Sequence, residues 1–412
     1  MFKHLFTKNP YKCYLSTQQK LWCETFSIKF HSKTSSERKQ LGGYEYEEDT
    51  SGFKNILAVT NSHLEIKETA SHKKLEVNFE WLRENCRCAS CYNGVTNQRN
   101  IRIFDLKTDI QPTTFSLFQN TLKIGWNDGH HSEYDLDWLR VQNRAEDIPA
   151  EILWSGDMSA HVEYVAASDV KSKEGITRLV KSLLDYGVGF VTNVKHNIQS
   201  TEEIIRCIGP PQKTLFGTMW EITNKMEHLD SAYSNVALDA HTDTSYFIEP
   251  AGLIIFHCME RNCEGGKTLL VDGFRAAKEV ELESPDLYHC LRTVPTEFQY
   301  IEKGYHLTSL STMIQHSLNG RINQIRYNLY DRSARQPLQS VLFYRSLRRL
   351  AAAVRKPKAE WWLTLEPGTL VFINNWRVLH GRSAFYGQRT IGGSYLHMGN
   401  FLSRARSLAL IT

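Results

Sequence analysis

Short runs in which hydrophobic and polar residues alternate occupy the first folded part of the chain. This period of two residues is typical of strands that have one buried face. It predicts strands at residues 56–60 and 63–67, and a hairpin whose two strands are Thr113–Phe118 and Thr121–Trp126. We therefore expect residues 45–145 to form a small β-rich domain.

The second part of the chain combines helical and strand patterns. A helix predicted at residues 171–186 leads into a strand at 189–192, and from Ala237 onward short apolar strands alternate with turns and a few helical inserts. The densest runs, Leu253–Phe256 and Leu370–Ile373, are as long as strands and far short of the roughly 18 to 20 apolar residues that span a bilayer. We expect no membrane segment, and a mainly β fold with flanking helices.

The N-terminal segment differs from the rest of the chain in its charge. Residues 1–40 carry a net charge of +6, and their first acidic residue is Glu24. The remaining residues carry a net charge of −2. A segment rich in Lys, Ser and Thr without a compact apolar region is typical of an organellar transit peptide, with a disordered basic arm as the alternative. A linker expected around residues 144–159 leaves residues 160–412 as a second, larger domain.

A second basic run lies near the C-terminal third of the chain. Between residues 342 and 358, Leu342, Leu347, Leu350 and Val354 are spaced as on one face of a helix. The Arg and Lys residues between them then form the solvated face of that helix. Because the folded part of the chain has no basic excess, the charge pattern favours no nucleic-acid partner.

Three of the nine cysteines, Cys86, Cys88 and Cys91, fall within six residues. Thiols this close together suit one shared cation better than disulfides with one another. Structural zinc prefers four tetrahedral N or S ligands, and the next candidates are His130 and His131, beyond the predicted hairpin. Three reduced cysteines without a metal are the alternative.

The motif His241-Thr242-Asp243 is the strongest chemical signal. Residues two apart on a strand project from the same face and can bind one metal together. His380, in the run NNWRVLHGR at residues 374–382, supplies a third ligand. Two His and one carboxylate leave the opposite positions of a metal open, as in non-haem Fe(II) oxygenases. A 2-oxo acid would take two of those positions, and O₂ the third.

Four motifs together resemble a known family. They are HTDTSYF at 241–247, GGKTLLVDGF at 265–274, IRYNLYDR at 325–332 and NNWRVLHGR at 374–382. The chain is similar over residues 75–410 to the family of Fe(II)/2-oxoglutarate oxygenases that contains trimethyllysine dioxygenase and γ-butyrobetaine dioxygenase. The resemblance implies an N-terminal zinc-binding domain and a double-stranded β-helix (jelly-roll) catalytic domain.

The resemblance also assigns roles to individual residues. It implies that the iron ligands are His241, Asp243 and His380, and that His130 rather than His131 joins the three cysteines on zinc. Arg389 and Thr268 fall where the family binds 2-oxoglutarate, and a guanidinium suits a carboxylate because it offers two parallel donors. The implied substrate residues are a cage for a quaternary ammonium and two groups for the opposite end of the substrate: Trp220, Tyr233, Tyr395, Phe216, Asp230 and Asn328.

The activity implied by the resemblance is hydroxylation of N6,N6,N6-trimethyllysine at C3, the first step of carnitine biosynthesis. The resemblance also implies that ascorbate is the reductant, that the protein is a homodimer and that it is located in the mitochondrial matrix. Hydroxylation of γ-butyrobetaine is the alternative within the class, and Asp230 favours trimethyllysine because a carboxylate would attract its α-ammonium. A non-catalytic, zinc-containing binding module is the alternative from another class.

Overall fold

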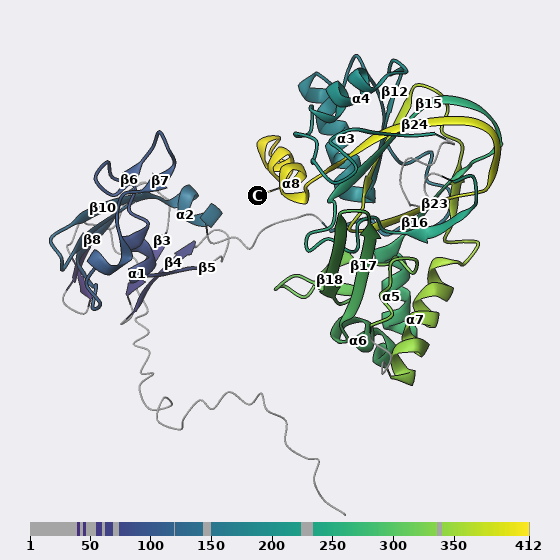
Figure 1. Cartoon of the computed structure of the whole chain (residues 1–412). Helices are drawn as coiled ribbons and strands as arrows, with labels where there is room; N and C mark the ends of the chain where they lie inside the picture. The colour runs from purple at the N-terminus through teal and green to yellow at the C-terminus, as the bar shows by residue number, and fades with distance from the viewer. Residues whose placement is uncertain are drawn as a thin grey trace, which may run out of the picture. The chain divides into compact units, whose positions relative to one another are not determined.

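A computed structural model of the chain describes residues 39–41, 44–46, 55–59, 62–68, 74–118, 120–142, 150–223, 234–335 and 340–411. The chain divides into two compact units, residues 1–145 and 146–412, and each is described by itself (Figure 1). Residues 1–38 of the expected transit peptide lie outside the described residues.

The N-terminal unit is built from small antiparallel sheets and two short helices. In chain order its elements are β1 (Lys39–Leu41), β2 (Tyr44–Tyr46), β3 (Asn55–Val59), β4 (His63–Glu68), β5 (Lys74–Asn78), α1 (Phe79–Glu84), β6 (Tyr92–Asn93), β7 (Gln98–Arg99), a 3₁₀ turn (Ile103–Asp105), β8 (Pro112–Phe118), β9 (Thr121–Trp126), β10 (His131–Asp135) and α2 (Leu136–Gln142). The strands predicted at 56–60 and 63–67 and the predicted hairpin are confirmed. The alternating residues Leu64 and Ile66 of β4, and Leu122 and Ile124 of β9, are buried in one core.

The C-terminal unit is larger and carries all the longer helices. Its elements are β11 (Tyr164–Ala166), α3 (Lys173–Tyr186), β12 (Val188–Thr192), α4 (Ile198–Ile205), β13 (Trp220–Ile222), β14 (Leu238–His241), β15 (Leu253–Gly265), β16 (Thr268–Asp272), α5 (Gly273–Glu283), α6 (Pro285–Thr293), β17 (Thr296–Glu302), β18 (Tyr305–Ser311), β19 (Ile314–His316), β20 (Ile322–Ile325), α7 (Val341–Val354), β21 (Trp361–Leu363), β22 (Thr369–Asn374), β23 (Val378–Arg382), β24 (Phe385–Leu396) and α8 (Met398–Ser407).

Two sheets form the centre of this unit. Their strand orders are β11-β12-β22-β15-β24-β13 and β14-β23-β16-β21. In the larger sheet, Leu253 and Ile255 pack toward the side of α3, α4 and α8, while Ile254 packs with Leu270 and Val378 of the smaller sheet. The apolar runs are continuous because both faces of these strands are buried. The mainly β, double-stranded β-helix fold with flanking helices is confirmed.

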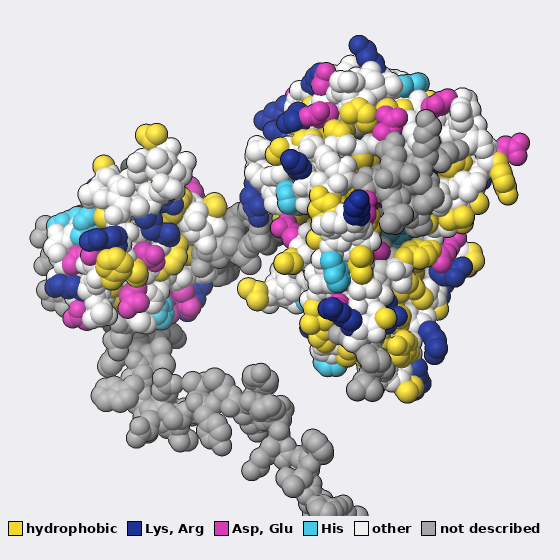
Figure 2. All heavy atoms as spheres, viewed as in Figure 1, with side chains coloured by type: hydrophobic (Ala, Val, Ile, Leu, Met, Phe, Trp, Pro, Cys, Tyr) yellow, Lys and Arg dark blue, Asp and Glu magenta, His cyan; other side chains and the backbone are white. Residues whose placement is uncertain are grey.

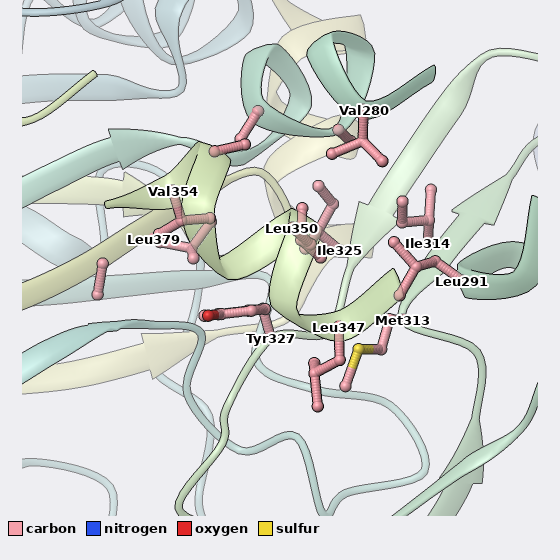
Figure 3. Close-up of a cluster of buried hydrophobic side chains, with 14 of the residues drawn as sticks. Val280, Leu291, Met313, Ile314, Ile325, Tyr327, Leu347, Leu350, Val354 and Leu379 are labelled. Carbon is pink, nitrogen blue, oxygen red and sulfur yellow. The ribbon is translucent and has the colours of Figure 1, made fainter. Parts of the chain in front are cut away.

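The buried face of helix α7 differs by one residue from the face predicted from the sequence. Figure 3 shows Leu347, Leu350 and Val354 of α7 among the side chains of a buried cluster in this unit. Phe343 is buried with them, but Leu342 is 43% exposed. Positions 343, 347, 350 and 354 follow the helical period, whereas residue 342 is rotated about 100° away from their stripe.

The polar side of α7 is tied to the neighbouring helix α5. Arg349 donates a hydrogen bond of 2.9 Å to Glu279 and also pairs with Glu283, and Lys356 lies 2.6 Å from Glu279. On the face of the molecule in Figure 2, basic and acidic side chains are intermingled in the same way. Across the described chain, no helix combines the length and the hydrophobicity needed to cross a membrane.

A buried ion pair joins distant parts of the C-terminal unit. The Arg377 guanidinium donates to the Asp272 carboxylate at 2.9 and 3.2 Å, and both side chains are at most 1% exposed. Arg377 also donates to the carbonyl oxygens of Ile152 and Asp185, and Asp272 accepts from the backbone N–H of Trp154. Residues 152–154 of the expected linker are therefore anchored to the sheet.

We predict that Asp272→Ala lowers the free energy of unfolding by about 3 to 5 kcal/mol, since it leaves a buried guanidinium without its counter-charge. Urea denaturation followed by tryptophan fluorescence measures the loss. Asp286→Ala, which removes an exposed carboxylate from the first turn of α6, is the matched control and should cost at most about 1 kcal/mol. Equal effects of the two substitutions would contradict the assigned role of the pair.

Candidate active site and metal centres

Two strands of the smaller sheet bring His241 and His380 together. In the antiparallel register of β14 and β23 the two residues are direct partners, and their ring centroids lie 4.7 Å apart. Partners in such a register place their side chains on the same face. The Nδ1–H of His241 donates to the carbonyl oxygen of Asp239 at 2.8 Å, which leaves its Nε2 free to accept or to bind a metal.

Asp243 lies beside this pair, but it is not positioned by the strand geometry that the sequence predicted. Strand β14 ends at His241, so the strand period of two does not place Asp243. Instead, the side chain of Asn375 accepts from the backbone N–H of Asp243 at 2.8 Å and donates to its carbonyl oxygen at 3.0 Å. The next residue, Thr244, has a φ of 55°, so the chain turns sharply there. A single buried amide therefore fixes the backbone of Asp243.

The carboxylate of Asp243 faces both imidazoles. Its Oδ1 lies 3.2 Å from Nε2 of His241 and 3.3 Å from Nε2 of His380, while its Oδ2 accepts from the hydroxyl of Tyr395 at 2.8 Å. Burial alone would raise the pKa of Asp243, but the two imidazoles hold that pKa well below its usual range. Burial also lowers the pKa of His380 and so favours the neutral form.

These three side chains fit a divalent transition metal. Their ligand atoms all lie within 4.8 Å of one another. An ionised carboxylate with two imidazole nitrogens is the donor set of non-haem Fe(II) sites. All three residues line one pocket of the C-terminal unit, so a metal held there would be accessible to a substrate.

Arg389 and Thr268 line the same pocket. Arg389 is on β24 and Thr268 is the first residue of β16. Among the described residues the Arg389 guanidinium has no hydrogen-bond or ion-pair partner, although it lies 5.8 Å from the ring of Phe385, and burial lowers its pKa. A half-buried guanidinium without a counter-charge suits a carboxylate ligand such as the end of 2-oxoglutarate.

Aromatic side chains form another wall of the pocket. Trp220 lies 5.8 Å from Tyr395 and 5.7 Å from Phe256, measured between ring centroids. Trp220 is on β13, which pairs with β24, and its direct partner there is Gly393. A Cβ at residue 393 would come within 2.2 Å of the Trp220 indole. Glycine at this position therefore makes room for the Trp220 ring. Phe216 also lines the pocket and packs edge-on against Tyr300 at 5.7 Å.

The remaining predicted substrate residues divide into two groups. Asp230 and Tyr233 lie outside the described residues. Asn328 lines the pocket, but its amide already donates to Asp331 at 2.7 Å and accepts from the backbone N–H of Tyr330 at 3.0 Å. In this structure Asn328 shapes a turn in the pocket wall.

Sequence reasoning did not identify four residues that the structure brings to the site: Asn375, Phe256, Tyr246 and Asp331. The ring of Phe256 lies 5.3 Å from that of His380 and helps to place it. Asn375, Tyr246 and Asp331 fall inside the motifs at residues 374–382, 241–247 and 325–332, which is the one signal that could have identified them. Phe256 lies in an apolar strand and carries no such signal.

In the N-terminal unit the cysteine cluster converges on His130. The Nε2 of His130 lies 3.3 Å from Sγ of Cys86 and 3.6 Å from Sγ of both Cys88 and Cys91. His131 is exposed on β10 and is not part of the group. Burial would raise the pKa of Cys88, but hydrogen bonds with Ser90 and the Cys91 backbone lower it to about 7. Three thiols and one imidazole in this arrangement fit a tetrahedral zinc ion.

A buried arginine connects the two halves of this cluster. Arg83 lies 3.6 Å from Sγ of Cys91 and donates to Asp128 at 2.8 Å. Asp128 in turn accepts from the backbone N–H of His130 at 2.9 Å. Three thiolates around a divalent ion leave one net negative charge, which a neighbouring guanidinium compensates.

Comparisons with known proteins agree with both units. Residues 155–395 match the family model of the taurine catabolism dioxygenase TauD, TfdA family, and residues 56–140 match the model gamma-butyrobetaine hydroxylase-like, N-terminal. Mitochondrial trimethyllysine dioxygenase is 37% identical in Rattus norvegicus and 36% identical in Homo sapiens, each over 84% of this chain and 86% of the relative. Trimethyllysine dioxygenase of Neurospora crassa is 31% identical over 82% of both chains. A solved taurine dioxygenase from Burkholderia xenovorans is 15% identical, with a TM-score of 0.47, over 60% of this chain and 90% of its own.

We predict that Asn375→Asp weakens metal binding by about 10- to 100-fold. The substitution keeps the acceptor for the N–H of Asp243 but removes the donor to its carbonyl oxygen and adds a buried charge. Calorimetric titration of the metal-free protein with Mn(II) measures the affinity. Asn319→Asp, in an exposed turn, is the control, and equal affinities in both variants would show that Asn375 does not fix Asp243.

Cys88→Ser should lower both the zinc content and the melting temperature, because binding energy at a structural zinc site is also folding energy. Mn(II) affinity of the C-terminal unit should stay unchanged. Elemental analysis and thermal melting test this, with Cys207→Ser on the other unit as the control. The zinc site is refuted if wild-type protein, purified under reducing conditions with zinc supplied, contains none.

Proposed function

Because the chain belongs to the trimethyllysine dioxygenase family, we propose that it hydroxylates N6,N6,N6-trimethyllysine at C3, with Fe(II) and 2-oxoglutarate. The reaction consumes O₂ and 2-oxoglutarate and yields hydroxylated substrate, succinate and CO₂. The product enters carnitine biosynthesis, as the resemblance implies.

One observation carries the proposal. A pocket of the C-terminal unit is lined by the His241, Asp243 and His380 group and by Arg389, whose guanidinium has no hydrogen-bond or ion-pair partner within the described part of the chain. A metal triad alone is compatible with many reactions. A metal triad beside an arginine that can bind a carboxylate fits the use of a 2-oxo acid as cosubstrate.

Each part of the pocket then has a task. His241, Asp243 and His380 would hold the iron, and Arg389 with Thr268 would hold the distal carboxylate of 2-oxoglutarate. Bound iron and 2-oxoglutarate supply the oxidising power that replaces a C–H bond with C–OH. The chain positions the substrate and excludes water, and the hydroxyl of Tyr395 keeps the Asp243 carboxylate oriented.

The cation of the substrate needs a different kind of partner. A trimethylammonium group has no N–H to donate, so aromatic faces attract it better than a hydrogen-bond acceptor does. Trp220 and Tyr395 are the described members of the proposed cage, with Phe216 at its edge and Tyr233 as a further member. Phe216 offers a ring face without a hydroxyl.

We also propose the features that the family resemblance adds. Residues 1–40 direct the chain to the mitochondrial matrix, residues 45–145 form a zinc-binding domain around Cys86, Cys88, Cys91 and His130, and residues 160–412 form the oxygenase domain. Ascorbate keeps the iron reduced, and the enzyme is a homodimer.

Succinate formation tests the proposal directly. Purified protein with Fe(II), ascorbate and 2-oxoglutarate should form succinate and 3-hydroxy-trimethyllysine from trimethyllysine, and much less product from γ-butyrobetaine. Asp243→Ala should abolish both products, because the site loses one of its three ligands. Mass spectrometry and a succinate assay measure the outcome.

The two substrates and the variant separate the alternatives. Turnover of γ-butyrobetaine alone would assign the alternative reaction, and no turnover of either amine would indicate a binding module. Wild-type turnover by Asp243→Ala with Fe(II) loaded would exclude the proposed triad. Arg292→Ala, an exposed residue of α6, is a control that should keep wild-type activity.

A further inference from the structure

Two arginines lie opposite each other in the larger sheet. In the antiparallel register of β15 and β24, Arg261 is the direct partner of Arg389. Direct partners in such a pair place their side chains on the same face, where like charges repel each other. Burial lowers the pKa of Arg389 and the charge of Arg261 lowers it further, so the two guanidiniums are close enough to interact. Arg389 lines the pocket of the triad, whereas Arg261 is not among the lining residues.

An irregularity in β15 directs Arg261 to this face. Cys258 is opposite Ile391 and Glu260 is opposite Thr390, so β15 has one residue more than β24 at this point. Such a bulge re-aims the side chains that follow it. Cys258 and Ile391 belong to one buried cluster, and after the bulge Glu260 is exposed while Arg261 is half-buried. Without the extra residue, Arg261 would project to the opposite face of the sheet.

No acid in the described part of the chain neutralises the two guanidiniums, since neither Arg261 nor Arg389 has an ion-pair partner there. Glu260, the acid nearest in sequence, is exposed and accepts a hydrogen bond of 2.8 Å from the side chain of Asn262. Burial raises the pKa of Cys258 to about 11, so this neighbouring thiol stays neutral. Two like charges without a counter-charge are costly, and a ligand carboxylate would compensate them.

A hydrogen bond fixes the side chain of Arg261. Its Nη2 donates to the carbonyl oxygen of Gly265 at 2.9 Å, and its Nε is buried without an acceptor among the described residues. The next residue, Gly266, has a φ of 64°, and a Cβ there would lie 3.6 Å from Cδ of Arg389. The turn that Arg261 holds therefore packs against Arg389 and leads to Thr268, the first residue of β16. Arg261 is thus a fixed positive charge beside Arg389.

We propose that Arg261 is a positioning residue of the cosubstrate site, which keeps the Arg389 guanidinium directed into the pocket and so selects a 2-oxo acid that has a second carboxylate. The proposal rests on the function proposed above, in which Arg389 binds the distal carboxylate of 2-oxoglutarate. Two guanidiniums that repel each other are both stabilised when a carboxylate binds beside them. A 2-oxo acid with an uncharged end gains no such stabilisation.

Binding of two 2-oxo acids to the Mn(II)-loaded protein, measured by calorimetry, tests the proposal. 2-Oxoglutarate and 2-oxopentanoate share the metal-binding end and the chain length, but only 2-oxoglutarate has a distal carboxylate. Arg261→Gln keeps a donor for the carbonyl oxygen of Gly265 and removes the charge. It should weaken binding of 2-oxoglutarate about 10-fold, the lower end of the value of a hydrogen bond to a charged group. Binding of 2-oxopentanoate should change by less than about threefold.

Three further variants show how Arg261 acts. Arg261→Lys keeps the charge and should keep the affinity for 2-oxoglutarate within about threefold of wild type. In an Arg389→Gln background, Arg261→Gln should cause little further loss, because its effect passes through Arg389. Arg206→Gln, which removes a charge from an exposed ion pair with Glu202 at the end of α4, is the control and should bind both acids like wild type.

The outcomes separate charge from structural support. An equal loss for both acids in Arg261→Gln would mean that Arg261 supports the turn only, and would overturn the proposal. Equal losses in Arg261→Lys and Arg261→Gln would show that the charge is not the cause. A full additional loss in the Arg389→Gln background would show that Arg261 does not act through Arg389. The ratio of the two dissociation constants within one variant does not depend on the fraction of protein that folds.

A wild-type result distinguishes this proposal from the function on which it rests. If the Mn(II)-loaded wild-type protein binds no 2-oxoglutarate, the proposed function fails. If it binds 2-oxoglutarate and Arg261→Gln keeps the wild-type ratio of the two dissociation constants, only the assignment of Arg261 fails. If Arg261→Gln yields no folded protein, Arg261→Met removes the same charge and gives the same comparison.

Discussion

The buried ion pair of Arg377 and Asp272 ties the catalytic strands to the rest of the C-terminal unit. Asp272 ends β16 and caps α5 through the backbone N–H groups of Phe274 and Arg275, and Arg377 directly precedes β23, which carries His380. The position of His380 therefore depends on two charges that water cannot reach. Such a pair fixes one geometry, since any other arrangement would leave a charge buried alone.

Much of this architecture could be predicted from the pattern of residues. The strands and the cysteine cluster were evident because alternation and ligand spacing are local properties of the sequence. The predicted buried face of α7 was partly wrong, because Leu342 is apolar but points away from the buried face of the helix. The placement of Asp243 could not be predicted locally at all, since the amide that fixes it belongs to Asn375, 132 residues away.

The lining of the substrate pocket could be predicted from local sequence even less well. Trp220 and Tyr395 were assigned from the family resemblance, because a single aromatic residue in a strand is usually a core residue. What brings them together is the pairing of β13 with β24 and the absence of a side chain at Gly393. Asp331 lies inside the motif at residues 325–332, but its residue type alone did not distinguish it, since an acid in a turn is ordinarily exposed to solvent.

The order of the larger sheet has a consequence for how the chain folds. Strand β22 lies between β12 and β15, and β24 lies between β15 and β13, so the last quarter of the chain fills both gaps. Until those residues have been synthesised, β12 has only β11 beside it, and β15 and β13 have no neighbour in this sheet. Contacts so distant in sequence close slowly and expose apolar edges in the meantime. Because β23 and β24 also bring His380 and Arg389, the catalytic pocket is completed only when folding of the whole unit is complete.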